Sequence, residues 1–397
     1  MCSPTKRTKS KRGSQSNIFE GLKIKPASPS SEASSLSTKI NLAKSIRHYM
    51  QSTFRFGQGT VSPHSLNGMR SQFTICMDEA YDYKIGTQDF DPDTIFPEIV
   101  SLGNQLSAIL QKQLTPLQES EFEDHILHCL ATIVYGSNMI ERAGSGSRIT
   151  LKLCMAIFRG EEIPDDIGET EEEFQELKKG LLRNDMPANV SAVLRSRREI
   201  VQHAKAATHM ISQLCVYDKD LSEEIILQTH KILTHKIDAE STPWKEYSGV
   251  YRTDEVSAGL HPFPHHSLVP YKMKDMIREL QSDMKEVIAK GTVDPIAIAS
   301  KYTHIFVNIH PFIDGNGRMC RLILNSILLK LGSFFVCIGE KQEDRSLYME
   351  VASNGGALED TYGDLDEEEK PVMHRELGSF VMSHVKERMR KLVSTLL

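Results

Sequence analysis

The chain has 397 residues, of which 40% are hydrophobic and 25% are charged, and its formal net charge is −6. These values are typical of a globular protein that is long enough for more than one packed unit. The negative charge argues against broad nucleic-acid binding. No apolar run reaches the roughly 20 residues of a membrane span, and the first residues lack the apolar stretch of a secretory signal. We therefore expect neither nucleic acid nor membrane as a partner.

Residues 1–40 are rich in Ser, Lys and Pro and poor in apolar residues, which predicts a disordered tail. A basic cluster at residues 6–12 is either a nuclear-import signal or a solvated part of this tail. The seven cysteines are scattered without metal-binding spacing, as expected for buried structural thiols in a reducing compartment. The expected location is cytoplasmic, with the nucleus left open.

Residues 41–220 are predicted to form an N-terminal helical region. Its best-marked helix, at about 115–144, begins with the pattern of a capping box, in which Thr115 precedes Pro116 and Gln118. Near the end of this helix lie Ser137 and Glu141, which are four residues apart and share one face. Other helices are expected at residues 42–50, 96–110, 149–158 and 187–214. His203 and His209, in the last of these, have no ligand-like neighbours in the sequence.

Residues 221–385 are predicted to be the catalytic domain, and residues 386–397 the end of a C-terminal helix. Helices are expected to begin after Ser222 and at Pro295. The remaining predicted elements are extended segments at 250–252 and 255–259, helices at 269–290 and 374–397, and a polar, acidic interruption at 354–371.

The segment from His261 to His266 contains three histidines, which is a composition that a metal site would have. No carboxylate accompanies them in this loop, and metal-bound histidines usually have such support. We therefore interpret this segment as a target-facing or packing loop.

The segment 310–321 reads His-Pro-Phe-Ile-Asp-Gly-Asn-Gly-Arg-Met-Cys-Arg. His310 follows an apolar run, and an imidazole can accept a proton near neutral pH. Asp314 offers the hard oxygen ligands that Mg²⁺ prefers. His310 and Asp314, which are four residues apart, thus combine a base with a metal ligand.

A glycine-rich turn formed by Gly315, Asn316 and Gly317 leads into a helix that we expect at about 318–331, with Gly332 as its C-cap. Such a turn is an anion site, because unpaired N–H groups and the helix dipole point toward the ligand. Arg318 and Arg321 lie on one face of this helix. The segment therefore predicts a site for nucleotide phosphates.

This segment resembles the signature of the Fic domain family, His-x-Phe-x-Asp/Glu-Gly-Asn-Gly-Arg-x-x-Arg, and matches it at every defined position. The resemblance implies a mainly α fold, a Fic-type helical bundle with a small β-hairpin flap beside the active site. It also implies a protein adenylyltransferase, which transfers AMP from ATP to a Ser, Thr or Tyr hydroxyl of a target protein.

The resemblance implies a role for each residue of the signature. His310 would be the catalytic base, and Asp314 would hold Mg²⁺ on the phosphates. The nucleotide-binding residues would be Gly315, Asn316, Gly317, Arg318 and Arg321. The target protein would dock at the flap, at about residues 250–260.

Ser137 and Glu141 resemble the upstream inhibitory motif of one class of Fic proteins, Ser/Thr-x-x-x-Glu-Gly/Asn. The resemblance implies that Glu141 pairs with Arg321 and keeps ATP from binding productively. The chain departs from the motif at Arg142, where Gly or Asn is usual.

Other readings stay open at this point. The same site would serve a de-AMPylase, with Glu141 aligning water, or a transferase that uses UTP or a choline-bearing nucleotide. A non-catalytic ATP-binding sensor is the alternative from another class. Thr361 and Tyr362 are candidates for self-modification. Neither the target protein nor the oligomeric state follows from the sequence.

Overall fold

The computed structural model describes residues 40–54, 60–61, 69–70, 72–73, 80–164, 166–240, 242–258, 261–363, 365–366 and 369–397. Residues 39–397 form one compact unit. The predicted disordered tail, apart from residue 40, and its basic cluster lie outside the described residues.

The described chain is mainly α-helical, as predicted. Its helices are α1 (Leu42–Thr53), α3 (Pro92–Leu110), α4 (Pro116–Ile140), α5 (Ser147–Phe158), α6 (Glu172–Arg183), α7 (Val190–Ile211), α8 (Glu223–Leu233), α9 (Trp244–Tyr247), α10 (Val269–Lys290), α11 (Pro295–Ile309), α12 (Asn316–Gly332), α13 (Gln342–Tyr362) and α14 (Arg375–Leu396), with a π turn η1 (Ser212–Val216) and a 3-10 turn η2 (His266–Leu268). None of the helices in the described part of the chain is both long and apolar enough to cross a membrane.

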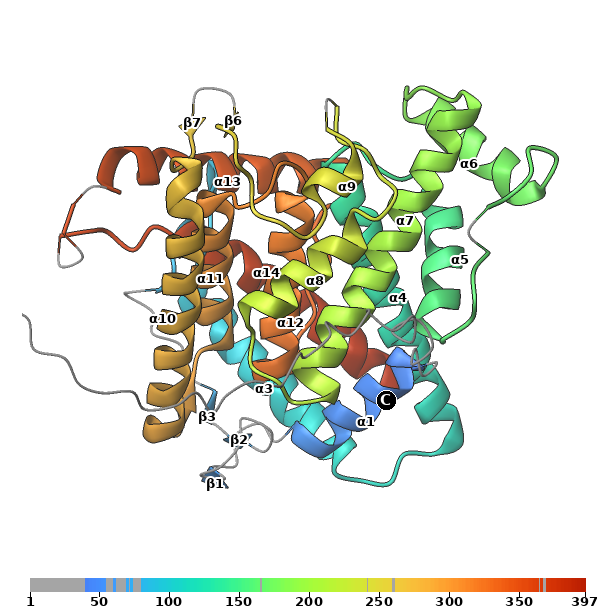
Figure 1. Ribbon diagram of the computed structural model, residues 1–397. Helices are drawn as coiled ribbons and strands as arrows, with labels where there is room; N and C mark the ends of the chain where they lie inside the picture. The colour runs from blue at the N-terminus through green and yellow to red at the C-terminus, as the bar shows by residue number, and fades with distance from the viewer. Residues whose placement is uncertain are drawn as a thin grey trace, which may run out of the picture. The chain divides into compact units, whose positions relative to one another are not determined.

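The described strands are two residues long and form separate pairs. These pairs are β1 (Thr60–Val61) with β2 (Met69–Arg70), β3 (Gln72–Phe73) with β8 (Thr292–Val293), β4 (Lys84–Ile85) with β5 (Gln88–Asp89), and β6 (Ser257–Ala258) with β7 (His261–Pro262). Only β3 and β8 run parallel among them. The pair β6–β7 is the predicted hairpin flap, and it stands at the top of Figure 1 near α10 and α13.

The predicted helix starts are confirmed by their caps. The Thr115 hydroxyl accepts the Gln118 N–H at 3.2 Å, and the Gln118 side chain accepts the Thr115 N–H at 3.1 Å, which completes the capping box before α4. The Ser222 hydroxyl caps α8 by accepting the Ile225 N–H at 3.3 Å. Pro295 opens α11, because a proline needs no N–H partner at a first turn.

Three local predictions were wrong. Helix α13 continues to Tyr362, through the interruption predicted from residue 354 onward, because Gly355 is buried against α11, where a Cβ would lie 3.2 Å from His304 Nδ1. Helix α12 is capped by Ser333, at φ 56°, rather than by Gly332. The segment 250–252 is a loop, and the hairpin pairs the second extended segment with residues 261–262.

Helix α12 lies in the core of the unit and carries the predicted anion site at its N-terminus. Nearly every side chain from Asn316 to Leu329 is buried, and α12 packs against α4, α7, α8 and α11 (Figure 1). From Leu322 to Leu329 most of these residues are apolar, and a helix segment that is apolar on all sides is expected in such an enclosed position. The four neighbours therefore surround the residues that follow His310.

Candidate functional site

The catalytic candidate His310 lies where the chain leaves α11. Its backbone is left-handed, at φ 49° and ψ 59°, and its N–H still donates to Phe306 O at 3.1 Å. A non-glycine residue in this region is uncommon, and such residues concentrate at functional sites. The left-handed turn ends α11 and starts the loop that leads to α12.

Two contacts orient the His310 ring. Its Nδ1 lies 3.2 Å from Val307 O, which is an acceptor only, so the proton of the neutral ring is on Nδ1 and Nε2 is the basic nitrogen. The Phe263 ring, from the flap, stacks on the imidazole with a centroid separation of 3.8 Å and an interplanar angle of 16°. This arrangement suits a residue that accepts a proton at Nε2.

Phe312 anchors the loop, and its partner is a histidine that the sequence did not single out. The Phe312 and His230 rings stack at 3.6 Å and 3° in the interior. The His230 Nε2–H donates to Asp314 O at 2.9 Å, while Nδ1 accepts the Gly249 N–H at 3.0 Å. Both ring nitrogens are thus used by the backbone, and a neutral His230 fixes the loop at Asp314.

This role of His230 predicts acid sensitivity. Burial lowers the pKa of His230 to about 4, below the ordinary value of 6.5. The unfolded chain therefore takes up the proton first as the pH falls, and stability is lost between about pH 6.5 and pH 4. The loss amounts to about 3 kcal/mol for a shift of this size. Denaturant titrations across this window should show a shallower pH dependence for His230→Gln than for the wild type. Parallel curves would contradict this assignment.

Asn316 closes the loop with its side chain. The Phe312 N–H donates to Asn316 Oδ1 at 3.0 Å, and Asn316 Nδ2 donates to Phe312 O at 2.8 Å. The sequence predicts Asn316 as a nucleotide-binding residue of the glycine-rich turn. Its side-chain amide is used by the backbone of the loop, and its own N–H is the group that can contribute to the predicted anion site.

We expect Asn316→Ala to lower the free energy of unfolding by about 2–4 kcal/mol, because it leaves the buried N–H and C=O of Phe312 without partners. Chemical denaturation measures this change. Asn104→Ala, at an exposed position of α3, is the matched control and should stay within about 0.5 kcal/mol. A loss for Asn316→Ala as small as that of the control would show that the hydrogen bonds between Asn316 and the Phe312 backbone do not stabilise the loop.

The first turn of α12, where the sequence predicts an anion site, faces a carboxylate. Gly315 is the N-cap, at φ 83°, and no side chain caps the helix. A Cβ built on Gly317 would collide with Glu141 Oε1. The Glu141 carboxylate therefore lies directly on the turn where N–H groups without intrahelical partners and the helix dipole favour negative charge.

Arg318 is 4% exposed and has unused donors. Its Nη2 donates to Asp314 Oδ2 at 3.1 Å, but Nε and Nη1 are buried without a partner in the described structure. Buried guanidinium N–H groups without acceptors are costly, and a phosphate would satisfy them. Burial works to raise the pKa of Asp314, but Arg318 and the Gly315 N–H outweigh it and lower that pKa. An ionised Asp314 with a 35% exposed side chain can hold a cation.

Arg321 is held by the end of α4. Its Nε donates to Ser137 Oγ at 2.8 Å, and its Nη2 donates to Ser137 O at 3.1 Å and to Glu141 Oε1 at 2.5 Å. The guanidinium also lies over the Tyr348 ring, 5.5 Å from the centroid. The structure thus brings Ser137, Glu141 and Arg321 together, although they are about 180 residues apart in the chain.

The way α4 ends shows why Gly or Asn is usual where this chain has Arg142. Glu141 is the C-cap, and Arg142 adopts the left-handed backbone at φ 52°. This conformation favours Gly or Asn, which are the residues usual in the inhibitory motif. Arg142 therefore keeps the conformation that the motif requires, and the carboxylate of Glu141 is still aimed at Arg321.

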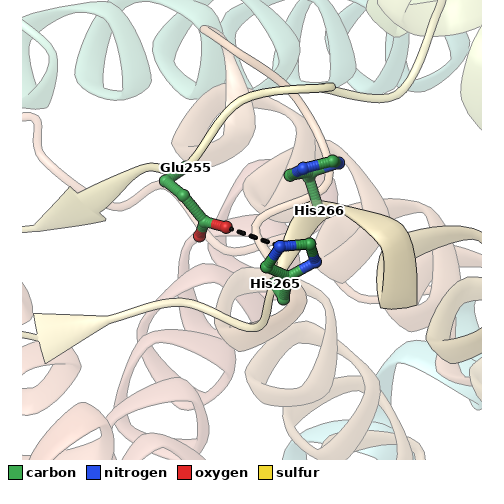
Figure 2. A group of neighbouring side chains, drawn as sticks. All are labelled: Glu255, His265 and His266. Atoms are coloured by element: carbon green, nitrogen blue, oxygen red, sulfur yellow. Dashed lines mark ion pairs between the residues drawn. The ribbon is translucent and has the colours of Figure 1, made fainter.

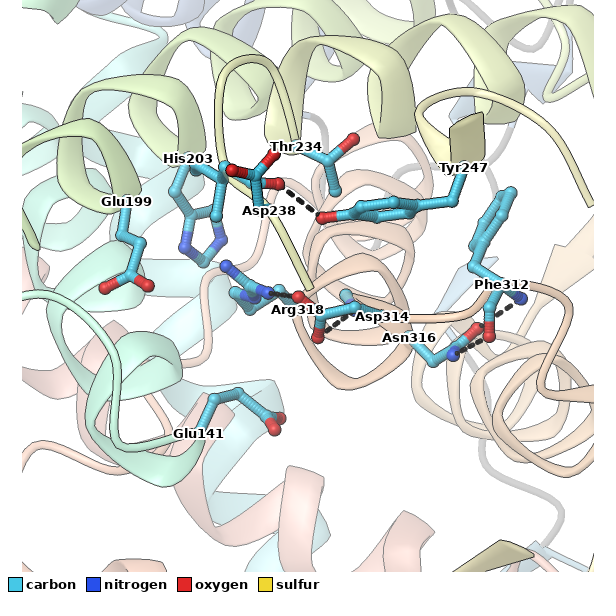
Figure 3. A network of polar contacts seen from close by, with 12 residues as sticks. Glu141, Glu199, His203, Thr234, Asp238, Tyr247, Phe312, Asp314, Asn316 and Arg318 are labelled. Carbon is cyan, nitrogen blue, oxygen red and sulfur yellow. Dashed lines mark hydrogen bonds and ion pairs between the residues drawn. The ribbon is translucent and has the colours of Figure 1, made fainter. Parts of the chain in front are cut away.

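His203, on α7, lies near Arg318 (Figure 3), although its neighbours in the sequence are not ligand-like. Burial lowers its pKa, and Arg318 and Arg321 lower it further, so the ring is neutral. Its Nδ1 lies 2.8 Å from Asn138 Oδ1, and its Nε2 is buried without a partner among the described residues. The ring thus adds no charge to the site.

Glu199, one turn before His203, fixes the chain just beyond Glu141. It accepts the Gly144 N–H at 2.7 Å, while the Ser196 hydroxyl donates to Gly144 O at 2.8 Å. Helix α7 therefore holds the turn that follows the end of α4. In the sequence, only the four-residue spacing of Glu199 and His203 indicates that the two side chains lie on the same face of α7.

Comparison with known proteins agrees with the fold and the signature. The Fic/DOC family model matches residues 220–328. Among solved structures, a Fic domain-containing signalling protein from Bacteroides thetaiotaomicron superposes with a TM-score of 0.52 at 17% identity, covering 75% of this chain and 96% of that one. Fic-1 from C. elegans superposes with a TM-score of 0.50 at 18% identity, covering 76% and 72%. The chain therefore has a Fic-type helical fold, and its residues 220–328 resemble a Fic/DOC domain.

Curated relatives match over shorter stretches. A Fido domain-containing protein of Dictyostelium discoideum is 38% identical over 84 residues, which are 21% of this chain and 56% of that protein. The protein adenylyltransferase Fic of Drosophila yakuba is 28% identical over 152 residues, which are 38% of this chain and 28% of that protein. The chain therefore spans about half or less of the length of these relatives.

Proposed function

We propose that the protein is an adenylyltransferase that transfers AMP from ATP to a Ser, Thr or Tyr hydroxyl of a target protein, and that Glu141 restrains this reaction. The observation that carries the proposal is the pair of buried arginines on α12. Arg318 has two unused donors, and Arg321 is neutralised by a carboxylate that lies on the helix N-terminus. The phosphates of a nucleotide such as ATP would replace that carboxylate. The adenylyltransferase among the relatives favours ATP as this ligand.

The reaction requires one base and stabilisation of phosphate charge. The target hydroxyl oxygen attacks the α-phosphorus of ATP, and the bond from this phosphorus to the bridging oxygen of the β-phosphate breaks. His310 Nε2 takes the hydroxyl proton, and pyrophosphate leaves with the electron pair. The N–H groups of the first turn of α12 and the two arginines would stabilise the charge on the phosphates, which usually is the largest contribution to catalysis.

Asp314 is the residue that would hold Mg²⁺. Its carboxylate is ionised and partly exposed, next to the unused donors of Arg318. Magnesium bound there would neutralise phosphate charge. Asp314 itself, kept in place by the Gly315 N–H and by Arg318, would orient the ion.

Glu141 would inhibit the transfer of AMP by occupying the place of the triphosphate. The Glu141 carboxylate lies on the phosphate-binding turn and uses Nη2 of Arg321. A triphosphate would have to displace it, or bind with its γ-phosphate away from Arg321. Both cost binding energy, because the Glu141–Arg321 contact is charge-assisted and partly buried.

The flap is the proposed docking edge for the target. Strand β6 pairs only with β7 in the described structure, and an edge strand can bind an extended segment through backbone hydrogen bonds. The Phe263 ring on His310 places the flap next to the base. The target segment would then present its hydroxyl to His310.

Labelling with two forms of ATP tests the chemistry. In the presence of Mg²⁺ and a cell extract, or of the purified protein alone for self-modification at sites such as Tyr362, label from the α-phosphate of ATP should become protein-bound. Label from the γ-phosphate should not. Transfer of the γ label would indicate a kinase, and transfer of neither would favour the ATP sensor. Competition by UTP or a choline-bearing nucleotide would reveal another donor.

A further inference from the structure

The flap is fixed to the catalytic loop by one buried arginine. Arg252 Nε donates to His310 O at 2.7 Å, Nη1 donates to Asp254 O at 3.0 Å, and Nη2 donates to Pro264 O at 2.5 Å. Its exposed fraction is 3%. The two sides of the hairpin, before β6 and after β7, are thus held at a fixed distance. The residues that follow, Glu255 and His265, consequently face each other.

Glu255, His265 and His266 form a cluster of metal-ligand groups at this place, and they lie on the two sides of the hairpin (Figure 2). One ligand atom from each lies within 4.8 Å of the others, and His265 Nε2 is 3.2 Å from Glu255 Oε1. The side chains of Glu255 and His265 are 61% and 56% exposed. The carboxylate that the histidine loop lacks in sequence is therefore supplied by the opposite side of the hairpin.

We propose that Glu255, His265 and His266 bind a divalent transition-metal ion, with Zn²⁺ as the representative ion. Two imidazoles and one carboxylate are a ligand set that suits zinc and its first-row neighbours rather than Mg²⁺. Bonds of about 2.0–2.2 Å place the ligand atoms of a tetrahedral zinc about 3.3–3.6 Å apart. The Glu255–His265 separation is close to this value, and small rotations of exposed side chains bring in His266. Water would complete the coordination.

Ser267 supports the His265 ligand. Its hydroxyl oxygen lies 2.8 Å from His265 Nδ1, and its backbone N–H donates to the same nitrogen at 3.3 Å. Nδ1 is therefore an acceptor in the metal-free chain. When Nε2 binds a metal, the proton moves to Nδ1, the contact with the N–H is given up, and the Ser267 hydroxyl serves as the acceptor. The ring already points Nε2 toward Glu255, so coordination requires a change of tautomer and no turn of the ring.

A metal ion at this place would join the two sides of the hairpin outside the reaction centre. Phe263, between β7 and His265, stacks on His310, and its N–H donates to Val256 O at 3.4 Å across the hairpin. Zinc would therefore slow the opening of the flap at this hydrogen bond. This consequence concerns binding and flap motion, and it does not depend on the proposed transfer of AMP.

Titration of the metal-free full chain with ZnCl₂, followed by calorimetry, tests the site. We expect one zinc site whose dissociation constant rises at least about tenfold in Glu255→Gln and which is lost in the double variant His265→Ala/His266→Ala. His48→Ala, which removes an exposed imidazole on α1, is the matched control and should leave this site unchanged. Unchanged zinc stoichiometry and affinity in both flap variants would overturn the proposal and leave Glu255 and His265 as a surface ion pair.

X-ray absorption of the zinc-loaded wild-type chain gives an independent readout. Ligation by nitrogen and oxygen at about 2.0–2.2 Å is expected, and scattering from sulfur at about 2.3 Å would assign the bound zinc to cysteines instead. Hydrogen exchange at Phe263 should slow on zinc addition in the wild type and not in the double variant. Equal slowing in both proteins would contradict the metal bridge.

Discussion

Replacing Glu141 with Gly is expected to increase the incorporation of AMP from ATP by about 10- to 100-fold. The variant frees Arg321 Nη2 and clears the turn at Gly317. A charge-assisted hydrogen bond of this kind contributes about 1.5–3 kcal/mol, and each 1.4 kcal/mol corresponds to a tenfold change. Initial rates of label transfer from α-labelled ATP, measured with equal amounts of wild type and variant, give the ratio directly.

Two further variants test whether the increase comes from the release of Arg321 or from a loss of helix stability on introducing a glycine. Ser137→Ala removes only the hydrogen bond from Arg321 Nε, so it should increase transfer less than Glu141→Gly does. Glu161→Gly changes an exposed acidic residue beyond α5 and should have no effect. Equal rates for wild type and Glu141→Gly would remove the inhibitory role. A chain that removes AMP from a modified target, and loses this activity in Glu141→Gly, would support the alternative of a de-AMPylase, in which water attacks the phosphodiester and AMP leaves the target hydroxyl.

Replacing His310 with Ala in the Glu141→Gly background is expected to reduce AMP transfer by about 10²- to 10⁴-fold, which is the usual contribution of a general base. The double variant keeps the turn at Gly315–Gly317 and both arginines. ATP binding should therefore remain within a few-fold of that of Glu141→Gly, whereas transfer is lost. Comparing the two quantities distinguishes a base from a residue that only supports the fold.

His48→Ala in the same background is the control, because this exposed imidazole lies on α1. Transfer should be unchanged in it. If label transfer survives His310→Ala, another group accepts the proton and the assignment of His310 is wrong. If ATP binding and transfer fall together, His310 supports the loop rather than the reaction.

The parts of the fold that local sequence determines were predictable. The caps at Thr115 and Ser222 and the opening of α11 at Pro295 depend on residues within one helical turn. The extent of α13 was not predictable in this way. Its polar composition around Gly355 indicates a break, and the helix continues because that glycine lets it pack closely on α11.

The same distinction applies to the site. The signature residues lie within one segment, so their chemistry could be predicted together. His230, Glu199 and Arg252 act through backbone atoms of segments distant in the chain, and no spacing in the sequence marks such partners. Asn316 is the opposite case. Its place in the glycine-rich turn suggests phosphate binding, but its side-chain amide binds the backbone of Phe312 and closes the loop.

A crystal structure of the Glu141→Gly chain with ATP and Mg²⁺ would show whether the first turn of α12 binds the triphosphate. We expect phosphate oxygens on the N–H groups at Gly315–Gly317, in contact with Arg318 and Arg321, and the α-phosphate open to attack beside His310. A triphosphate bound elsewhere, with the first turn of α12 left empty at saturating ATP, would contradict this expectation.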